Sequence, residues 1–520
     1  MEKANVVETV NIKINGMSLS VPKNYTILEA AREIGIEIPT LCYLKEINEI
    51  GACRICVVEV KGARSLITAC VYPVFEGMEV FTNTKKVQQA RKITLELILS
   101  THERKCLSCV RSGTCELQQL CQEFGVDDET RYEGEIPEYK FDDSAIHMTR
   151  NNAKCILCRR CVGACQNQKV SVIGVNDRGF DTHIGCTFDN NLSDVPCVSC
   201  GQCIVNCPTG AIVERDDSQK VIDALNDPSK YVIVQTAPSI RVTLGECFGM
   251  EIGTNVKGKM VAALRRLGFD KVFDTDIAAD LTIVEEANEL IERVSNGGAL
   301  PLITSCSPGW IKYCEYYYPE FIKNLSSCKS PQQMFGAIAK TWYANKHHIN
   351  PKDIVVVGIM PCTAKKFEVS RDDEDASGYP DVDIALTTRE LGRMISRAHI
   401  NFKDLPDEEF DNPLGISTGA GAIFGATGGV MEAALRTAAE TLEGKSLDNV
   451  DYVEVRGTDE IKEAVYKIAG MDVKVAVTSG LKGAHALLER IKAGEQFHFV
   501  EVMGCPGGCV NGGGQPIQHA

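Results

Sequence analysis

Two runs of closely spaced cysteines constrain this chain more than any other feature of its sequence. Both runs have the spacing C-x2-C-x2-C-x3-C, and their members are Cys155, Cys158, Cys161, Cys165, Cys197, Cys200, Cys203 and Cys207. Disulfide frameworks are typical of small secreted domains, whereas this chain has 520 residues, and its 24 cysteines bunch at short intervals. The spacing therefore predicts metal ligation and not disulfide bonding.

The repeated spacing resembles that of bacterial ferredoxins, in which three thiolates of each run share a cluster with the last thiolate of the other run. This resemblance implies two [4Fe-4S] clusters. The ligands of the first are Cys155, Cys158, Cys161 and Cys207. The ligands of the second are Cys197, Cys200, Cys203 and Cys165. Redundant zinc knuckles are the alternative interpretation of the two runs.

A further set of cysteines lies closer to the N-terminus, at Cys42, Cys53, Cys56 and Cys70. Before it, two alternating apolar segments meet at Asn15-Gly16, a pair suited to a hairpin turn. Thr26 and Glu29 then form the capping-box pattern of a helix start. This order of strands and helix resembles the β-grasp of a ferredoxin, and four thiolates there can hold a [2Fe-2S] cluster. A zinc site is the alternative.

The next set has the spacing H-x3-C-x2-C-x5-C and follows a helical pattern over 87–102; it consists of His102, Cys106, Cys109 and Cys115. A neutral imidazole can replace one thiolate as an iron ligand. Both N-terminal sets resemble those of iron-only hydrogenases and of the large iron-sulfur subunit of respiratory complex I, which implies a [4Fe-4S] cluster with one histidine ligand. The alternative is that His102 only caps the end of the helix.

From residue 231 onward the chain resembles an α/β enzyme, with six apolar segments that we expect to be buried strands: 231–238, 300–306, 353–362, 383–388, 474–480 and 498–505. Three of these lead into the sequences TSCSPGW (304–310), MPCTAKKFE (360–368) and EVMGCPGGCVNGGGQP (501–516). These closely resemble the three signatures of iron-only ([FeFe]) hydrogenases. The expected fold is an α/β catalytic domain preceded by α+β ferredoxin-like iron-sulfur modules. The expected domains are 1–80, 81–140, 141–220 and 221–520.

The resemblance implies an H-cluster, which is a [4Fe-4S] cube bridged by a cysteine to a two-iron centre with CO, cyanide and a dithiolate. By motif, Cys362 and Cys505 bind the cube and Cys509 is the bridge. The first signature of the family normally reads TSCCPGW, so the fourth ligand position is Ser307 in this chain. Three alternatives stay open: Ser307 ligates through oxygen, Cys306 takes its place, or the altered site binds the cluster less tightly.

The same resemblance implies which residues surround the two-iron centre. Lys365 and the backbone near Pro238 and Ser239 would hydrogen-bond its cyanide ligands. The residues that would pack around its other ligands are Pro331, Gln332, Met360 and Met503. The alternative makes Lys365 an exposed helix residue and the methionines ordinary core residues.

A proton path is also implied, through Cys306, Glu286, Ser326, Glu289 and Arg293 in that order. Glu286, Glu289 and Arg293 have the spacing of one helix face, and such a stripe is usually solvated. A buried glutamate would instead have a raised pKa, which suits proton exchange near neutrality.

The expected function is reversible hydrogen oxidation and proton reduction, with electrons relayed through one [2Fe-2S] and three accessory [4Fe-4S] clusters. Implied partners are ferredoxin or flavin- and NAD(P)-linked subunits, and H-cluster maturation proteins. A net charge of −15 argues against sequence-independent nucleic-acid binding. We expect no membrane span, and a cytoplasmic location because the first ten residues lack an export pattern. The alternatives are a non-catalytic electron-transfer subunit resembling that of complex I, and a hydrogen sensor.

Overall fold

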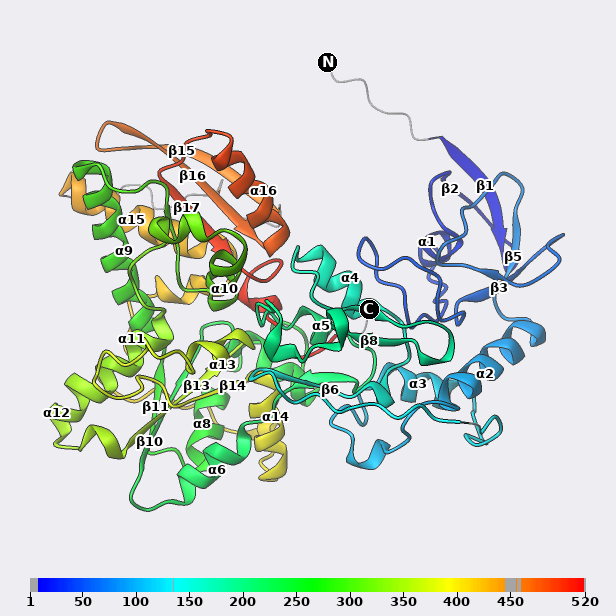
Figure 1. Ribbon diagram of the computed structural model, residues 1–520, viewed down its shortest axis with the longest axis horizontal. Helices are drawn as coiled ribbons and strands as arrows, with labels where there is room; N and C mark the ends of the chain where they lie inside the picture. Colours follow the sequence, from blue (N-terminus) through cyan, green and yellow to red (C-terminus); the bar gives the residue numbers. More distant parts are fainter. Residues whose placement is uncertain (1–7, 134, 445–454, 456–459, 519–520) are drawn as a thin grey trace.

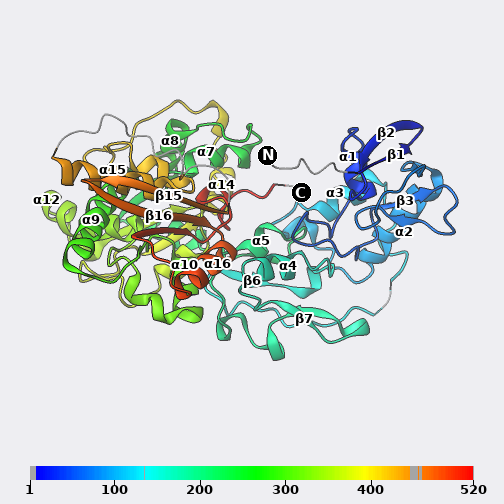
Figure 2. The same ribbon diagram turned by 90° about the horizontal axis from the view of Figure 1, so that it is seen from above.

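The computed structural model describes residues 8–133, 135–444, 455 and 460–518 (Figure 1). Along the longest axis, the N-terminal modules lie at one end and the residues from about 231 onward at the other (Figures 1 and 2). Helices α4 (Arg160–Asn167) and α5 (Gln202–Val205) lie between them in both views. The ferredoxin-like module therefore lies between the N-terminal modules and the catalytic part, and the first module contacts it directly through a hydrogen bond from Asn48 to the carbonyl of Cys158.

The first module is a five-stranded sheet with the strand order β2-β1-β5-β3-β4 and one short helix. Its strands are β1 (Thr9–Ile14), β2 (Met17–Pro22), β3 (Val57–Val60), β4 (Ile67–Thr68) and β5 (Glu79–Phe81). Asn15 and Gly16 join β1 to β2 with φ values of 49° and 85°, as the predicted hairpin turn requires. Helix α1 (Ile27–Arg32) begins at Thr26 with both capping-box bonds to Glu29. The predicted hairpin and helix start are confirmed.

Helices α2 to α5 and two short sheets form the middle of the chain. Helix α2 (Lys85–Leu99) packs on β3 and on α3 (Glu116–Glu123). Strands β6 (Met148–Arg150) and β9 (Ile212–Glu214) then pair, as do β7 (Gly174–Asn176) and β8 (His183–Gly185).

The last part of the chain contains two four-stranded sheets. The first has the order β11-β10-β13-β14 and is parallel throughout, whereas the second has the order β12-β17-β16-β15. Their strands are β10 (Tyr231–Thr236), β11 (Lys271–Asp274), β12 (Leu302–Ile303), β13 (Ile354–Met360), β14 (Ile384–Thr387), β15 (Ile461–Ile468), β16 (Met471–Ser479) and β17 (Phe499–Met503). All six predicted strands are present. The sequence did not indicate β11 or β15, and the side chains of β15 alternate between buried and exposed.

Helices cover both sheets. The longer ones are α6 (Ser218–Asn226), α8 (Lys257–Leu267), α9 (Asp276–Asn296), α10 (Pro308–Tyr317), α11 (Pro331–Ile338), α14 (Thr388–Arg397), α15 (Gly429–Glu443) and α16 (Leu481–Lys492). The shorter ones are α7 (Ile240–Thr243), α12 (Ala344–His347) and α13 (Ala364–Glu368). Within the described residues, no helix combines the length and the apolar character needed to cross a membrane.

One apolar core joins the ferredoxin-like module to the second sheet. Buried members from the module, such as Cys161 and Ile204, belong to the same cluster as Trp310, Leu481 and Val500. The ferredoxin-like module therefore packs directly against the catalytic part through a shared apolar core. This joint brings its cysteines close to the ends of the strands.

Candidate active site and iron-sulfur ligand sets

A cavity lies where four parallel strands of the two sheets end. The segments that follow β10, β12, β13 and β17 all contribute to its wall, and ligand sites are common at such strand ends. It contains about 730 Å³ of space free of protein atoms, including the part open to solvent. The wall includes twelve residues expected from the sequence: Pro238, Ser239, Cys306, Ser307, Pro331, Gln332, Met360, Cys362, Lys365, Met503, Cys505 and Cys509.

Three thiols converge on this cavity, from the buried residue Cys505 and from the half-buried residues Cys362 and Cys509. Burial raises the pKa of Cys362, and burial together with the charge of the Cys362 thiolate raises the pKa of Cys505 and Cys509, the latter to about 12. Thiols that repel one another as anions are stabilised as thiolates by a bound metal. The donor set therefore fits the iron-sulfur cube of an H-cluster.

Ser307 and Cys306 have different surroundings. Ser307 precedes α10, and its Oγ accepts a hydrogen bond from the N–H of Gly504 at 3.1 Å, next to Cys505. Burial, followed by the charges of Glu286 and Cys509, raises the pKa of the Cys306 thiol far above its ordinary value. Ser307 thus lies beside a cube cysteine, whereas Cys306 lies between the cavity and the carboxyl of Glu286.

The stripe on α9 is not a solvated face at Glu286. This side chain is fully buried, and burial raises its pKa to about 7. Among the described residues, neither of its oxygens has a hydrogen-bond partner of ordinary geometry, although the Ser326 hydroxyl and the backbone of Ser305 lie near enough to lower the pKa. Ser326 Oγ donates a hydrogen bond to Glu289 at 3.2 Å, and Arg293 donates another to the same carboxylate. The structure thus brings the five residues of the expected proton path together.

Lys365 is a buried residue of α13, so its interpretation as an exposed helix residue is wrong. Its Nζ lies 2.9 Å from Oε1 of Glu368 and donates to the carbonyl of Cys306 at 3.3 Å. Glu368 also accepts hydrogen bonds from Ser330 Oγ and Gln332 Nε2, each at 2.9 Å. The oxygen of the same carboxamide, Gln332 Oε1, is buried and has no hydrogen-bond partner among the described residues.

Two glutamates beside the cavity were missed by sequence reasoning. Glu368 ends the second signature, and Glu501 lies fully buried in β17. The carboxylate of Glu501 accepts hydrogen bonds from the N–H groups of Gly428 and Met431, each at 2.7 Å, and burial raises its pKa to about 7. A single acidic residue inside the apolar strand FVEVM was the available signal.

The N-terminal cysteines are also brought together. Cys56 and Cys70 have their sulfur atoms 3.3 Å apart, and hydrogen bonds from Cys53 and Cys70 hold the pKa of Cys42 at about 2. All 24 cysteines are free of disulfides, as the sequence predicted. The four thiols therefore form one compact donor set.

The two ferredoxin-like runs cross over in the structure. After burial, the charges that raise the pKa of Cys161 come from Cys158, Cys155 and Cys207. Those that raise the pKa of Cys200 come from Cys197 and Cys165, and then from Cys362 at the cavity. The last cysteine of each run therefore lies with the first three of the other run.

The second of these two sets, which includes Cys200, lies at the joint between the module and the cavity. Gly201 has φ of 71°, and a Cβ there would lie 2.9 Å from Cα of Gly513. A residue larger than glycine does not fit at this contact. The backbone of the module therefore approaches the third signature closely, beside Cys362 and Cys505.

His102 is buried beyond the end of α2, and burial lowers its pKa to about 4, so the imidazole is neutral. Its Nδ1 is buried without a hydrogen-bond partner among the described residues. Cys106 is exposed, and Cys109 and Cys115 are half-buried. A neutral ring with an unpartnered nitrogen has the chemistry of a metal ligand.

Fold and site define a redox enzyme in which iron-sulfur modules lead to a buried metal cavity. Comparison with protein families agrees. Residues 230–513 match the family described as iron only hydrogenase large subunit, C-terminal domain. Residues 7–85 match a 2Fe-2S iron-sulfur cluster binding domain, and residues 91–130 match the NADH-ubiquinone oxidoreductase-G iron-sulfur binding region.

Individual proteins show the same relationship. The NADP-reducing hydrogenase subunit HndD of Solidesulfovibrio fructosivorans is 50% identical over 98% of this chain and 89% of that protein. Iron hydrogenase 1 of Clostridium pasteurianum is 44% identical over 97% of this chain and 88% of its own length. A solved structure of [FeFe]-hydrogenase HydA1 from Chlamydomonas reinhardtii matches with a TM-score of 0.52 and 41% identity, covering 58% of this chain and 85% of that one.

The chain belongs to the iron-only, or [FeFe], hydrogenase family. Its reaction is the reversible oxidation of hydrogen and reduction of protons, with electrons relayed by iron-sulfur clusters.

Proposed function

We propose that this hydrogenase works with an H-cluster in the cavity and four accessory clusters, one [2Fe-2S] and three [4Fe-4S]. The observation that carries the proposal is the convergence of Cys362, Cys505 and Cys509 at the ends of strands from two sheets. When bound, the H-cluster supplies the two-iron centre at which hydrogen is split or formed. The proposed clusters together contain about 20 iron atoms per chain.

The residues of the chain divide the remaining work. Cys362, Cys505 and Cys509 hold the cube with Ser307 in the fourth position, because Ser307 Oγ lies beside Gly504 in the wall. Lys365 holds a positive charge at the two-iron end, and Glu368 orients its ammonium group. The other side chains of the wall, such as Met360 and Met503, exclude water.

Protons move along α9 in this proposal. Cys306 exchanges a proton with Glu286, whose pKa of about 7 allows both protonation states near neutrality. Ser326 then connects Glu286 to Glu289. Arg293 lies at the outer end of this path, and the side chains of Glu289 and Arg293 are each 15% exposed.

Electrons from the two N-terminal modules reach the cavity through the ferredoxin-like module, which lies between them and the catalytic part. We assign domains to 1–80, 81–140, 141–220 and 221–520, with one ligand set in each of the first two and two ligand sets in the third. The ligand set that includes Cys200 delivers electrons to the cube. Cys200 lies close enough to the cavity for its charge to raise the pKa of Cys505, and the charge of Cys362 raises the pKa of Cys200. Iron content and electron paramagnetic resonance of the purified chain test the cluster count. A protein with three or fewer accessory signals would contradict it.

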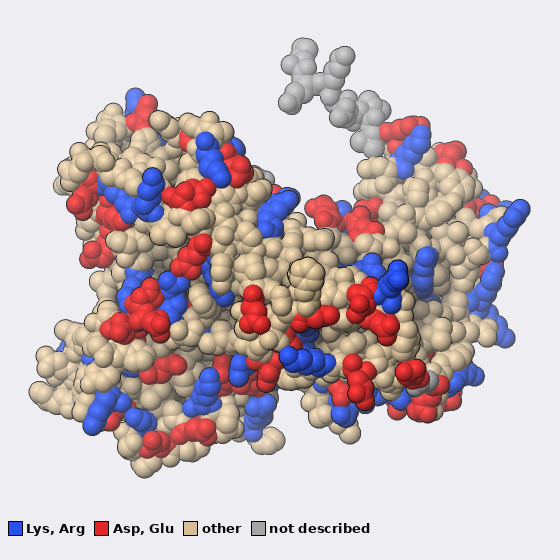
Figure 3. Space-filling model, viewed as in Figure 1, with Lys and Arg blue, Asp and Glu red and all other residues tan. Residues whose placement is uncertain are grey.

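We further propose that the chain passes electrons to a flavin-containing subunit linked to NADP, in the cytoplasm. The support is its 50% identity to a protein named as a subunit of an NADP-reducing hydrogenase. On the face drawn in Figure 3, acidic and basic side chains are interspersed and leave no continuous basic area, which suits protein partners better than nucleic acid. Purification of the chain at native abundance tests this, because it should bring down a flavoprotein. Isolation of the chain alone, active with ferredoxin, would favour the alternative carrier.

A further inference from the structure

Gln515 is a buried residue of the third signature, and it lies behind the loop of Cys509. Its side-chain Oε1 accepts hydrogen bonds from the hydroxyls of Thr243 and Thr388, at 2.8 and 2.7 Å. Its Nε2 donates to Oγ of Ser239 at 3.3 Å and to the carbonyl of Cys509 at 3.2 Å. The carboxamide therefore has partners for both its acceptor and its donor groups, and the single proton of Thr243 is shared with the carbonyl of Ser239 at 3.0 Å.

The orientation of this carboxamide is set by chemistry. The backbone carbonyl of Cys509 can only accept a hydrogen bond, so the NH2 group of Gln515 has to face it. Ser239 and Cys509 both line the cavity, but Ser239 follows β10 of the first sheet and Cys509 follows β17 of the second. One planar group thus connects the two walls of the cavity.

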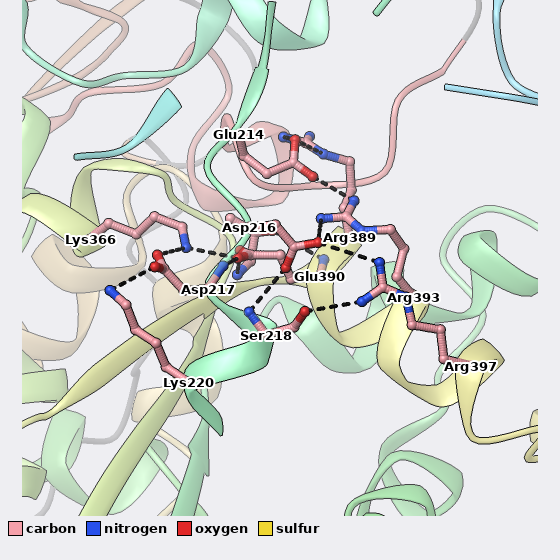
Figure 4. A network of polar contacts seen from close by, with 11 residues as sticks. Glu214, Asp216, Asp217, Ser218, Lys220, Lys366, Arg389, Glu390, Arg393 and Arg397 are labelled. Carbon is pink, nitrogen blue, oxygen red and sulfur yellow. Dashed lines mark hydrogen bonds and ion pairs between the residues drawn. The ribbon is translucent and has the colours of Figure 1, made fainter. Parts of the chain in front are cut away.

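A buried ion pair holds the backbone on either side of Gln515. Arg389, in the first turn of α14, donates hydrogen bonds to the carbonyls of Gly513 and Gln515. The same guanidinium binds Glu214, with Nε and Nη2 at 3.0 and 2.8 Å from Oε2. Arg393 lies 2.7 Å from the other oxygen of Glu214 (Figure 4). Glu214 is the last residue of β9, in the ferredoxin-like module.

Electrostatic attraction in a buried site holds the Arg389–Glu214 pair together. The side chains of Glu214 and Arg389 are only 3% and 10% exposed. Burial alone would raise the pKa of Glu214, but the charges of Arg389 and Arg393 hold it well below its ordinary range. A buried charge is stable only while its partner stays in place. The planar guanidinium of Arg389 is therefore held by Glu214, and it holds in turn the carbonyls of Gly513 and Gln515.

We propose that Gln515 is a positioning residue that keeps the Cys509 loop and the Ser239 turn at one separation, and that the Arg389–Glu214 pair ties this clamp to the ferredoxin-like module. The inference rests on the proposed function, because both ends of the clamp line the cavity assigned to the H-cluster. Gln515 acts on the bridging cysteine through its carbonyl and does not touch the reacting atoms.

The first test replaces Gln515 by glutamate in the matured enzyme. Gln515→Glu keeps the shape but cannot donate to Cys509 or Ser239, and it sets a carboxylate against a carbonyl. Gln518→Glu is the matched control, because Gln518 is exposed and its side chain bonds the side chain of Glu246, away from the Cys509 loop. In Gln515→Glu, the infrared bands of bound CO and cyanide should shift and broaden, and turnover should fall about tenfold or more. Accessory-cluster signals and the control variant should match the unmodified protein.

The second test compares two arginine variants and still applies if Gln515→Glu does not fold. Arg389→Lys retains a charge for Glu214 but loses the fork that reaches both carbonyls, whereas Arg393→Lys affects Glu214 without touching the third signature. We expect band shifts in the first variant only. Identical spectra for the two lysine variants would overturn the tie to the module, and wild-type bands in Gln515→Glu would overturn the clamp. Absence of CO and cyanide bands in the unmodified enzyme would instead overturn the proposed function and this inference with it.

Discussion

Arg293 donates a hydrogen bond to the carboxylate of Glu289, one turn earlier in α9. Glu289 also accepts hydrogen bonds from Ser326 and from the backbone of Ser327. Glu286, one turn further in, has no donor of ordinary geometry within the described part of the chain, and burial is the largest influence on its pKa. The outer glutamate therefore lies among several hydrogen-bond donors, whereas burial raises the pKa of the inner glutamate to about 7.

The first prediction concerns proton transfer at Glu286. Gln at this position keeps the shape but cannot ionise, so Glu286→Gln should lower hydrogen turnover by about a hundredfold or more. Cluster content should stay unchanged, since Glu286 is not among the proposed ligands. The matched control is Glu285→Gln, on the exposed side of the same helix. Full turnover in Glu286→Gln would remove this stripe from the proton path.

The second prediction is the pH at which Glu286 titrates. Burial raises its pKa from 4.5 to about 7, so the neutral acid should dominate below pH 7 and the carboxylate above it. Infrared spectra recorded across this range should show a carboxylic-acid band that fades as the pH rises through about 7. Because Glu501 has a similar pKa, the band is assigned by its loss in Glu286→Gln. A band already lost by pH 5 would show that Glu286 is solvated.

The third prediction concerns the ligand at Ser307. Its Oγ lies beside Gly504, so Ser307→Cys should place a thiolate at the cube and increase cube retention per protein. Accessory-cluster signals should not change. Ser305→Cys, two residues earlier, is the control, because the Ser305 hydroxyl bonds the carbonyl of Cys328. If cube occupancy were unchanged by Ser307→Cys but abolished by Cys306→Ala, Cys306 would be the ligand.

The fourth prediction concerns His102. Its buried, unpartnered Nδ1 and its lowered pKa indicate a neutral ligand, so His102→Ala should remove or convert one [4Fe-4S] signal in electron paramagnetic resonance. The other accessory signals should remain. His399→Ala, at an exposed position far along the chain, controls for the loss of an imidazole. Spectra that match the unmodified protein would exclude His102 as a ligand.

The cysteine sets and the strands could be read from the sequence because their signals are local. Ligands such as Cys155, Cys158 and Cys161 lie within one turn-rich segment, and each strand of the first sheet that was predicted is a short apolar run. The division of the strands into two sheets was not predictable in this way. It depends on pairings such as β12 with β17, whose residues are far apart in sequence.

The supporting residues of the cavity were missed for the same reason. Gln515 bonds Thr243 across 272 positions, and Arg389 bonds Glu214 across 175. No spacing rule connects such residues, since only the folded chain brings them together. Glu368 is an exception, because it lies three residues after Lys365 in the same helix, where helical spacing could have indicated the pair.

The central claim is that the cavity at the strand ends holds an H-cluster served by four accessory clusters. The most direct measurement is infrared spectroscopy of the purified, matured protein, combined with its iron content. We predict bands of bound CO and cyanide together with about 20 iron atoms per chain. Full accessory-cluster iron without any CO or cyanide band would contradict the claim, and would identify the chain as an electron carrier without a catalytic centre.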